Sequence, residues 1–213
     1  MRVLVTAGNT LTPVDKVRVL TNVFSGRTGA NIATEARRRG HEVLLLTSKP
    51  ETAGDVPVRA YSTYDDLAEA MTELILGGRW DAIIHAAAVS DYAVAGVYAL
   101  DADGLPRVDV SAGKVKSSHG ELWLRLTPTP KLVDRIRPEW GFRGTLVKFK
   151  LEVGLGEDEL LAVAERSRLA SGADLMVANT LETMADRAYL GPIAGRYERL
   201  PRAELAKRLV ELM

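Results

Sequence analysis

The stretch Asn22-Val23-Phe24-Ser25-Gly26-Arg27-Thr28-Gly29 lies between a strand-like run at residues 3–6 and a helical stretch at residues 30–39. Small residues let backbone N–H groups approach an anion closely, and a helix start adds unpaired donors and the positive end of a dipole. The carboxamide of Asn22, the hydroxyl of Ser25 and the guanidinium of Arg27 would stand beside that anion. The stretch therefore predicts a phosphate site. On spacing alone, a helix entry with a serine cap and turn glycines is equally compatible with it.

Strand-like and helical segments alternate along the chain. The runs that predict strands lie at residues 3–6, 42–47, 81–86, 145–151 and 174–178, and the helical stretches at 30–39, 64–76 and 158–169. This alternation predicts an α/β fold, in which a mostly parallel, doubly wound, Rossmann-like sheet is covered on both faces. Ligands of such sheets bind beyond the carboxyl ends of the strands. Gly8, Asp91 and Asn179 follow expected strand ends, so we expect their loops to converge on one crevice.

Residues 93–127 interrupt this alternation. Turn signals occur at Asp103-Gly104 and Ser118-His119-Gly120, and residues 121–126 alternate between polar and apolar side chains. We interpret the segment as a β excursion from the main sheet, so that residues 1–213 form a single domain. A late hairpin is expected at residues 191–200, and a last amphipathic helix at 202–213.

Composition narrows the class of protein. The chain has 213 residues, enough for one sizeable core, and 28 basic residues balance 28 acidic ones. We therefore expect no nucleic-acid or membrane partner, and no apolar run reaches transmembrane length. The absence of cysteine excludes disulfides and thiol chemistry. His41, His85 and His119 have no metal-ligand spacing, and the N-terminus does not read as a signal peptide. A cytoplasmic protein without a protein-held metal is expected.

Five blocks of sequence occur in a fixed order. The first, residues 5–29, opens with Val-Thr-Ala-Gly-Asn-Thr and closes with Ser-Gly-x-x-Gly. The others are Ala-Ala-Ala-Val-Ser-Asp-Tyr (86–92), Lys-Val-Lys-Ser-Ser (114–118), Phe-Lys-Leu-Glu (149–152) and Val-Ala-Asn (177–179). In this order and spacing they resemble phosphopantothenoylcysteine synthetase, the ligase of coenzyme A biosynthesis, from about residue 2 to the C-terminus.

The resemblance implies a reaction between small molecules and a set of residues. In this family the carboxylate of 4′-phosphopantothenate attacks the α-phosphorus of a nucleoside triphosphate, and the cysteine amine then displaces the nucleotide from the acyl nucleotide. Positioned donors and Mg²⁺ suit the charge that develops in both steps. The resemblance implies Asn22 and Lys114 as catalytic residues. It implies contacts with the acid substrate by Arg18, Asn22 and Ala88, and with the nucleotide by Gly8, Ser25, Gly26, Arg27, Gly29, Ala87, Asp91, Lys114, Lys116, Phe149 and Asn179.

Several of these residues also have plainer interpretations. Asn22 could stabilise a turn, and Arg18 could be a solvated surface charge. Asp91 could cap the segment that follows it. Lys114 and Lys116 could protect the edge of a strand.

Departures from the bacterial family pattern bear on the co-substrate. Bacterial members carry a Lys-x-x-x-Lys pair that binds the CTP phosphates, and Ser167 and Ser171 fall at those positions in an ungapped alignment. The second half resembles eukaryote-type members, so the resemblance implies ATP or CTP as co-substrate with ATP preferred. Asn9 replaces a family glycine and adds bulk beside the expected site. Bacterial members often carry a flavin domain in front of this region; without it we expect no flavin. The family's dimerisation implies a homodimer in which the excursion completes the site.

Two other functions remain open from the sequence. An NAD(P)-binding reductase would need Gly-x-Gly-x-x-Gly directly at the first strand end. Gly8 stands there, but Gly26 and Gly29 come about twenty residues later, and no Tyr-x-x-x-Lys pair is present. A non-catalytic nucleotide-binding homologue on the same fold also remains open, because a fold does not determine a function.

Overall fold

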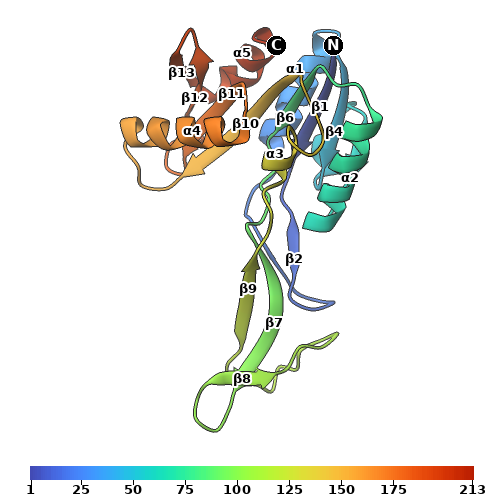
Figure 1. The fold of residues 1–213 in the computed structure, drawn as a ribbon, viewed down its shortest axis with the longest axis vertical. Coiled ribbons are helices and arrows are strands. Elements are labelled where there is room, and N and C mark those ends of the chain that lie inside the picture. The colour runs from blue at the N-terminus through green and yellow to red at the C-terminus, as the bar shows by residue number, and fades with distance from the viewer.

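One eight-stranded sheet forms the centre of the molecule (Figure 1). The structure is a computed structural model that describes all residues from 1 to 213. In spatial order the strands are β13 (Arg196–Pro201), β12 (Arg187–Ile193), β11 (Leu175–Thr180), β10 (Thr145–Glu152), β6 (Ala82–His85), β1 (Arg2–Ala7), β4 (Glu42–Thr47) and β5 (Val58–Ala60). The strands from β11 to β5 run parallel, whereas β12 and β13 are antiparallel. The predicted doubly wound, Rossmann-like sheet is confirmed.

Helices cover both faces of the sheet, because successive side chains of each buried strand point to opposite faces. On β1, Val3 and Val5 pack with α1 (Arg27–Arg38) and α5 (Leu205–Glu211). Leu4 packs on the other side with α2 (Tyr64–Gly77) and α3 (Leu132–Arg135). That second face also carries α4 (Glu157–Ser171), whose Leu160 and Ala164 pack against β11 and β12. None of the helices combines the length and the apolar run that crossing a bilayer requires.

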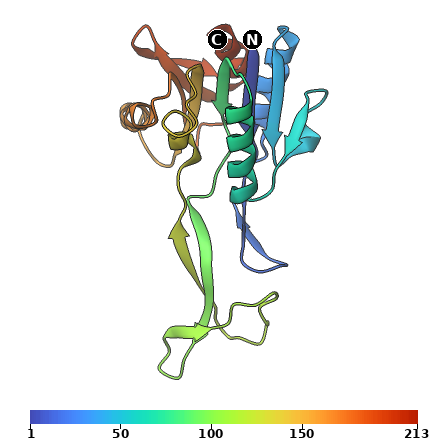
Figure 2. The same cartoon turned by 45° about the vertical axis from the view of Figure 1, so that its right-hand side comes forward.

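Two segments leave the carboxyl ends of the strands and form a projecting arm (Figures 1 and 2). One is a hairpin of β2 (Leu11–Pro13) and β3 (Val19–Thr21), inserted between β1 and α1. The other is an antiparallel sheet in which β7 (Tyr92–Leu100) pairs with β8 (Pro106–Asp109) and β9 (Trp123–Pro128). We call residues 11–21 and 92–128 the arm. The predicted excursion is confirmed, and it is joined by a hairpin that the periodicity did not indicate.

Long-range pairing moves several element boundaries. The strand expected at residues 121–126 begins at Trp123, because its register is set by β7, where Trp123 lies opposite Tyr98. The expected late hairpin is β12 and β13, and it begins earlier, at Arg187. The helix expected at residues 30–39 begins at Arg27. The last helix, expected at 202–213, is divided into a short 3-10 helix η2 (Arg202–Glu204) and α5.

Candidate functional site

Three glycines bring the end of β1 into contact with the start of α1. Gly8 and Gly26 adopt positive φ angles of 85° and 75°. A Cβ atom at Gly26 would lie 3.0 Å from the Gly8 nitrogen, and one at Gly29 would lie 2.5 Å from the Ala7 Cβ. Only glycine allows the backbones to approach so closely. Gly8, Gly26 and Gly29 therefore form one cluster in space.

This cluster corrects the expectation that the glycine fingerprint of dinucleotide-binding folds is missing. The fingerprint is divided in sequence, with Gly8 before the β2–β3 hairpin and Gly26 and Gly29 after it. The hairpin projects into the arm, so its two ends return to the same point of the sheet. Spacing along the chain could not show this, because the inserted residues lie outside the β1–α1 connection in space.

The start of α1 offers free hydrogen-bond donors. Its N-cap residue is Gly26 rather than Ser25, and no side chain caps it. The first helical bond runs from the Ala30 N–H to the Gly26 carbonyl at 3.2 Å, and the N–H groups of residues 27–29 have no protein acceptor. No acidic residue occupies the first turn. The serine-cap interpretation is therefore wrong, and the unpaired donors make this helix start suitable for an anion.

A cavity of about 440 Å³, which we call the switch-point cavity, lies against this helix start. It opens between the carboxyl ends of β1 and β6, where the strand order reverses and doubly wound sheets bind ligands. Its lining contains the predicted residues Gly8, Ser25, Gly26, Arg27, Gly29, Ala87, Ala88, Asp91, Phe149 and Asn179. It also contains residues that were not expected to bind. Val23, Phe24, Thr28, Ala86, Val89, Lys150 and Leu151 lie within the quoted blocks, whereas Met184 and Arg202 lie outside all of them.

Asn22 lies at the rim of the switch-point cavity, directly after β3. Its Nδ2 donates to the carbonyl of Ala88 at 3.2 Å, and Ala88 lines the cavity. An amide nitrogen carries two hydrogens, so one N–H remains without a protein acceptor. The side chain is thus anchored by one bond and keeps a neutral donor for charge that develops at the rim.

Arg202 lines the switch-point cavity, although no sequence motif indicated it. From η2 its guanidinium donates to the Thr28 hydroxyl and to Oδ1 of Asn179 at 3.4 Å. Burial lowers the pKa of Arg202, with no neighbouring carboxylate to oppose the shift. Asn179 lies inside β11 rather than after it, and its Nδ2 donates to the Arg187 carbonyl at 2.8 Å. The amide of Asn179 therefore positions Arg202, which presents an unpaired positive charge to the cavity.

The remaining predicted residues line a second pocket, on the arm. This arm pocket has a volume of about 500 Å³ and is lined by Val17, Arg18, Lys114, Val115, Lys116, Ser117 and Ser118. None of these residues lines the switch-point cavity. Lys114 and Lys116 lie in a loop between β8 and β9, so they do not protect a strand edge. The structure thus gathers the nucleotide residues at the sheet and leaves Arg18, Lys114 and Lys116 apart from them.

One carboxylate holds the arm pocket together. Asp15 accepts hydrogen bonds from Nε of Arg18 at 3.0 Å and from the Val115 N–H at 3.0 Å. Arg18 also donates through Nη2 to the Val115 carbonyl at 2.7 Å. The Arg18 guanidinium, followed by the Val115 N–H, holds the pKa of the Asp15 carboxyl well below its usual range. Arg18 is therefore a fixed charge and not a freely solvated one.

Ser167 and Ser171 do not belong to a nucleotide site. Both lie in the last turns of α4, where the Ser167 carbonyl and the Ser171 hydroxyl accept hydrogen bonds from Lys148 Nζ at 3.0 and 3.2 Å. Lys148 is 8% exposed, and burial lowers its pKa. The helix starts at the carboxyl edge of the sheet and ends at the opposite edge, so neither serine lines the switch-point cavity. These two positions therefore do not contribute to the switch-point cavity.

Asn9 also lies away from the cavity. Its backbone N–H donates to the Ser48 hydroxyl at 2.9 Å, and its Nδ2 donates to the Thr21 hydroxyl. The side chain is 3% exposed and joins the ends of β1 and β4 to the hairpin. The bulk expected beside the site is therefore packed inside the fold.

Comparisons with known proteins agree with this geometry. The family described as DNA/pantothenate metabolism flavoprotein C-terminal domain matches residues 1–210. The coenzyme A biosynthesis bifunctional protein CoaBC of Thermococcus kodakarensis is 38% identical over 214 residues, covering 98% of this chain and 49% of that protein. The crystal structure of the DNA/pantothenate metabolism flavoprotein from Streptococcus pneumoniae has a TM-score of 0.86 at 31% identity, over 100% of this chain and 97% of that one.

A more distant structure shows the same fold. A Cab2 mutant in complex with phosphopantothenate-cysteine has a TM-score of 0.74 at 19% identity, over 99% of this chain and 85% of that one. The chain spans half or less of the first curated relatives that it matches, 49% and 40% of their lengths. The match over residues 1–210 and the agreement with the Streptococcus structure confirm the resemblance seen in the sequence blocks. This chain belongs to the family of the DNA/pantothenate metabolism flavoprotein C-terminal domain, with the coenzyme A biosynthesis proteins as its relatives.

Proposed function

We propose that this chain is a phosphopantothenate–cysteine ligase that works through an acyl nucleotide. The observation that carries the proposal is the switch-point cavity, where the free N–H groups of residues 27–29 and the unpaired Arg202 guanidinium line one space, with Asn22 at its rim. A triphosphate needs such donors, and the reaction builds negative charge on oxygen in each step. The coenzyme A biosynthesis relatives support this choice of substrates.

In the proposed first step, a carboxylate oxygen of phosphopantothenate attacks the α-phosphorus, and the bond to pyrophosphate breaks. The α1 N–H groups and Arg202 would hold phosphate oxygens, while the free N–H of Asn22 would donate to the oxygen on which charge grows. In the second step, the cysteine amine attacks the acyl carbon, loses a proton and releases the nucleoside monophosphate. Neither step needs a protein nucleophile, which is consistent with a chain that contains no cysteine.

A magnesium ion fits this site together with the nucleotide. Asp91 is the one carboxylate that lines the cavity, and no cluster of three or more His, Cys, Asp or Glu residues could hold a metal ion. Mg²⁺ is commonly bound by one or two carboxylates together with substrate phosphates. Asp91, whose carboxylate has no protein partner, would hold Mg²⁺ against the phosphates, where the ion neutralises their charge.

We propose ATP as the preferred nucleotide. Ser167 and Ser171 lie outside the switch-point cavity, so the preference is supported by the Lys-Val-Lys-Ser-Ser and Phe-Lys-Leu-Glu blocks. Measured kcat/KM values with the two nucleotides decide the point. A ratio of tenfold or more in favour of CTP, about 1.4 kcal/mol in transition-state binding, would contradict the proposal.

Two chains would together complete the site. Arg18 and Lys114 line a pocket separate from the switch-point cavity, so one chain alone does not bring them to the nucleotide. The arm also exposes large apolar side chains, with Val17 65%, Tyr92 51% and Trp123 50% exposed. Exposed apolar strands favour association, and a twofold axis would place each arm on the other subunit. We therefore propose a homodimer of the single domain.

Mixed subunits test this arrangement, after sedimentation at micromolar concentration has measured the stoichiometry. Asn22→Asp and Lys114→Ala proteins are mixed, unfolded and refolded together. If Lys114 reaches across, a random mixture should regain about a quarter of wild-type activity, because half the dimers are mixed and each has one intact site of two. A dimer without regained activity would confine each site to one chain.

Pyrophosphate release tests the ligase itself. Incubation with phosphopantothenate and ATP or CTP, without cysteine, should produce pyrophosphate and an acyl nucleotide. Added cysteine should then release the nucleoside monophosphate. Folded protein that shows no turnover with any nucleoside triphosphate would support a non-catalytic nucleotide-binding homologue instead.

A nicotinamide reductase is the second candidate, because the glycine cluster is restored in space. Gly8, Gly26 and Gly29 at a helix start also suit the pyrophosphate of a dinucleotide. Titration with NADPH, followed by its fluorescence, separates the two functions. Tight NADPH binding with hydride transfer to a substrate would support the reductase, and no binding would remove it.

A further inference from the structure

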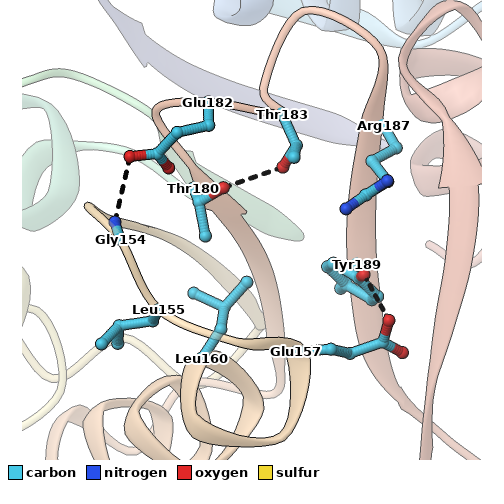
Figure 3. A pocket seen from close by; sticks show the side chains of 9 residues that line it. All are labelled: Gly154, Leu155, Glu157, Leu160, Thr180, Glu182, Thr183, Arg187 and Tyr189. Atoms are coloured by element: carbon cyan, nitrogen blue, oxygen red, sulfur yellow. Dashed lines mark hydrogen bonds between the residues drawn. The ribbon is translucent and has the colours of Figure 1, made fainter.

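A third cavity lies on the other face of the sheet, close to its carboxyl edge (Figure 3). Its volume is about 280 Å³, and it shares no lining residue with the switch-point cavity. The alternation of side chains explains this separation. On β11, Asn179 lines the switch-point cavity on the α1 face, whereas Thr180 lines the new one. On β12, Arg187 and Tyr189 both point to the face covered by α4, so we call this space the α4 cavity.

The guanidinium of Arg187 in the α4 cavity has no partner. Its Nε is the one buried side-chain nitrogen or oxygen of the chain that lacks a hydrogen bond, and Arg187 takes part in no ion pair. Figure 3 shows the side chain extending from β12 beside the cavity, near Tyr189. A buried donor without a partner destabilises the folded protein. A ligand that accepts a hydrogen bond from this guanidinium would therefore gain binding free energy by satisfying the buried Nε.

A carboxylate stands on the same wall of the α4 cavity. Tyr189 donates through its hydroxyl to Oε2 of Glu157 at 2.7 Å, which leaves the other carboxylate oxygen without a protein donor (Figure 3). The second acidic lining residue, Glu182, already accepts from the Gly154 N–H at 3.0 Å. The first turn of α4 contains three acidic residues, so this helix start does not favour a simple anion. The cavity thus offers one free cation, on Arg187, and carboxylate oxygens without a hydrogen-bond donor on Glu157 and Glu182.

The rest of the lining is small and partly apolar. Leu155 and Leu160 form an apolar wall, and the hydroxyls of Thr180 and Thr183 bond each other at 2.9 Å. A cationic ligand would leave the buried Nε of Arg187 without a partner, and an anionic ligand would leave Glu157, an exposed carboxylate, without a positive group beside it. A ligand with one charge of each sign avoids this.

We propose that the α4 cavity binds a small zwitterion, an α-amino acid with a short aliphatic side chain. Its carboxylate accepts from the Arg187 guanidinium, which is suited to bidentate pairing. Its ammonium group donates to the free oxygen of Glu157, and its side chain lies against Leu155 and Leu160. The inference does not depend on the proposed ligase activity, because the two cavities share no residue.

Calorimetric titration of the whole protein with L-valine tests the proposal. Isovalerate and isobutylamine, which each lack one of the two charges, and inorganic phosphate serve as comparison ligands. L-valine should bind at least tenfold more tightly than any of the three. Arg187→Met should weaken L-valine binding at least tenfold, and Glu157→Gln should weaken it severalfold while reducing the preference over isovalerate. Arg196→Met, which removes an exposed cation of β13 outside the cavity, is the matched control and should bind L-valine as the wild type does.

The Arg187→Met protein should stay folded, because the substitution removes an unsatisfied buried donor. Without ligand, this variant should therefore unfold thermally at or above the wild-type temperature. If Arg187→Met fails to fold, Arg187→Lys takes its place. Lysine keeps the positive charge but lacks the paired N–H donors of the guanidinium, so Arg187→Lys should also weaken L-valine binding. No binding of L-valine at millimolar concentration overturns the proposal. Equal binding of phosphate or isovalerate would indicate an anion site instead and overturns it too. Unchanged L-valine binding in a folded Arg187→Met protein would place the amino acid elsewhere, while pyrophosphate release reports the ligase separately.

Discussion

The switch-point cavity and the arm pocket hold their functional groups in different ways. At the sheet, the close packing of Gly26 against Gly8 and of Gly29 against Ala7 fixes the start of α1. The hydrogen-bond donors there are backbone N–H groups held in place by the buried core. On the arm, exposed lysines surround a pocket held by the Asp15 carboxylate, and no helix covers that layer. A site built from packed backbone is complete within one chain. A site built from exposed side chains on a projecting sheet depends on what the arm contacts.

The largest effect should follow from changing the residue that joins the two regions. Asn22→Asp places a negative charge at the cavity rim, beside the oxygen on which charge develops. Loss of one such donor costs on the order of 3 kcal/mol, so we expect kcat to fall about a hundredfold. Asn22→Ala removes the donor without adding charge and should cost less. Both variants should unfold thermally within a few degrees of the wild type, and an unchanged kcat in Asn22→Asp would remove this side chain from the mechanism.

Arg202→Met tests whether the sheet side binds the nucleotide by itself. Hydrogen bonds to charged groups contribute about 2 kcal/mol, so affinity for a non-hydrolysable triphosphate should fall about thirtyfold. The KM for phosphopantothenate should change little if the arm binds that substrate. Arg199→Met, an exposed cation on β13, is the control. A normal nucleotide affinity in Arg202→Met would show that the guanidinium only supports Thr28 and Asn179.

The convergence of the loops with Gly8 and Asp91 could be predicted because both follow strand ends, whereas the individual binding residues were implied by the family resemblance. Parallel strands bring their carboxyl ends to one edge, so the loops with Gly8 and Ala87 had to meet whatever the details of the packing. Short apolar runs predicted the strands themselves, and these agree with the structure at β4 and nearly so at β1 and β10. The local sequence was sufficient for these strands because a parallel sheet buried on both faces requires nearly continuous runs of apolar residues.

The rest depended on contacts between distant segments. Arg202 follows the antiparallel edge, and only folding places it beside Thr28. Ser171 lies away from the switch-point cavity because α4 runs away from the carboxyl edge of the sheet, and its last turn contacts the buried Lys148. The position of Lys114 depends on the contact between Asp15 and Val115, which are 100 residues apart. No local pattern encodes a contact of that range.

Lowering the pH should destabilise the main sheet through His85, which lies outside the arm. His85 on β6 is 8% exposed, with Nδ1 3.0 Å from the Thr6 hydroxyl. Burial, with a smaller effect of the Lys148 charge, lowers the pKa of His85 to about 4. As pH falls below about 6.5 the unfolded chain binds the proton first, so the free energy of unfolding should decrease by about 1 kcal/mol between pH 7 and 5.5.

Urea unfolding at the two pH values measures this loss. His85→Gln can keep a hydrogen bond to the Thr6 hydroxyl but does not titrate, so its stability should change less with pH. Equal slopes for the variant and the wild type would mean that His85 is protonated at similar pH in both states.

The smallest effect should be confined to the arm. The depressed pKa of Asp15 means that its contribution is present above the unfolded value of about 4 and is lost as pH falls toward the folded value. Asp15→Asn removes this charge at neutral pH and should speed amide exchange at residues 113–116. We expect the KM for phosphopantothenate to rise about threefold. Arg18→Ala should raise the same KM, because both variants break the contact between Asp15 and Arg18.

Nucleotide affinity decides what this result means. Asp109→Asn, which changes an arm carboxylate bound to the Ser111 N–H at 2.9 Å, is the matched control and should leave both substrates unaffected. If Asp15→Asn weakens phosphopantothenate alone, the arm pocket and the switch-point cavity bind different substrates. If nucleotide affinity falls in parallel, the loop around Lys114 must lie against the nucleotide. In a dimer that contact can come from the other chain, so the same variant mixed with wild-type subunits would show an intermediate affinity.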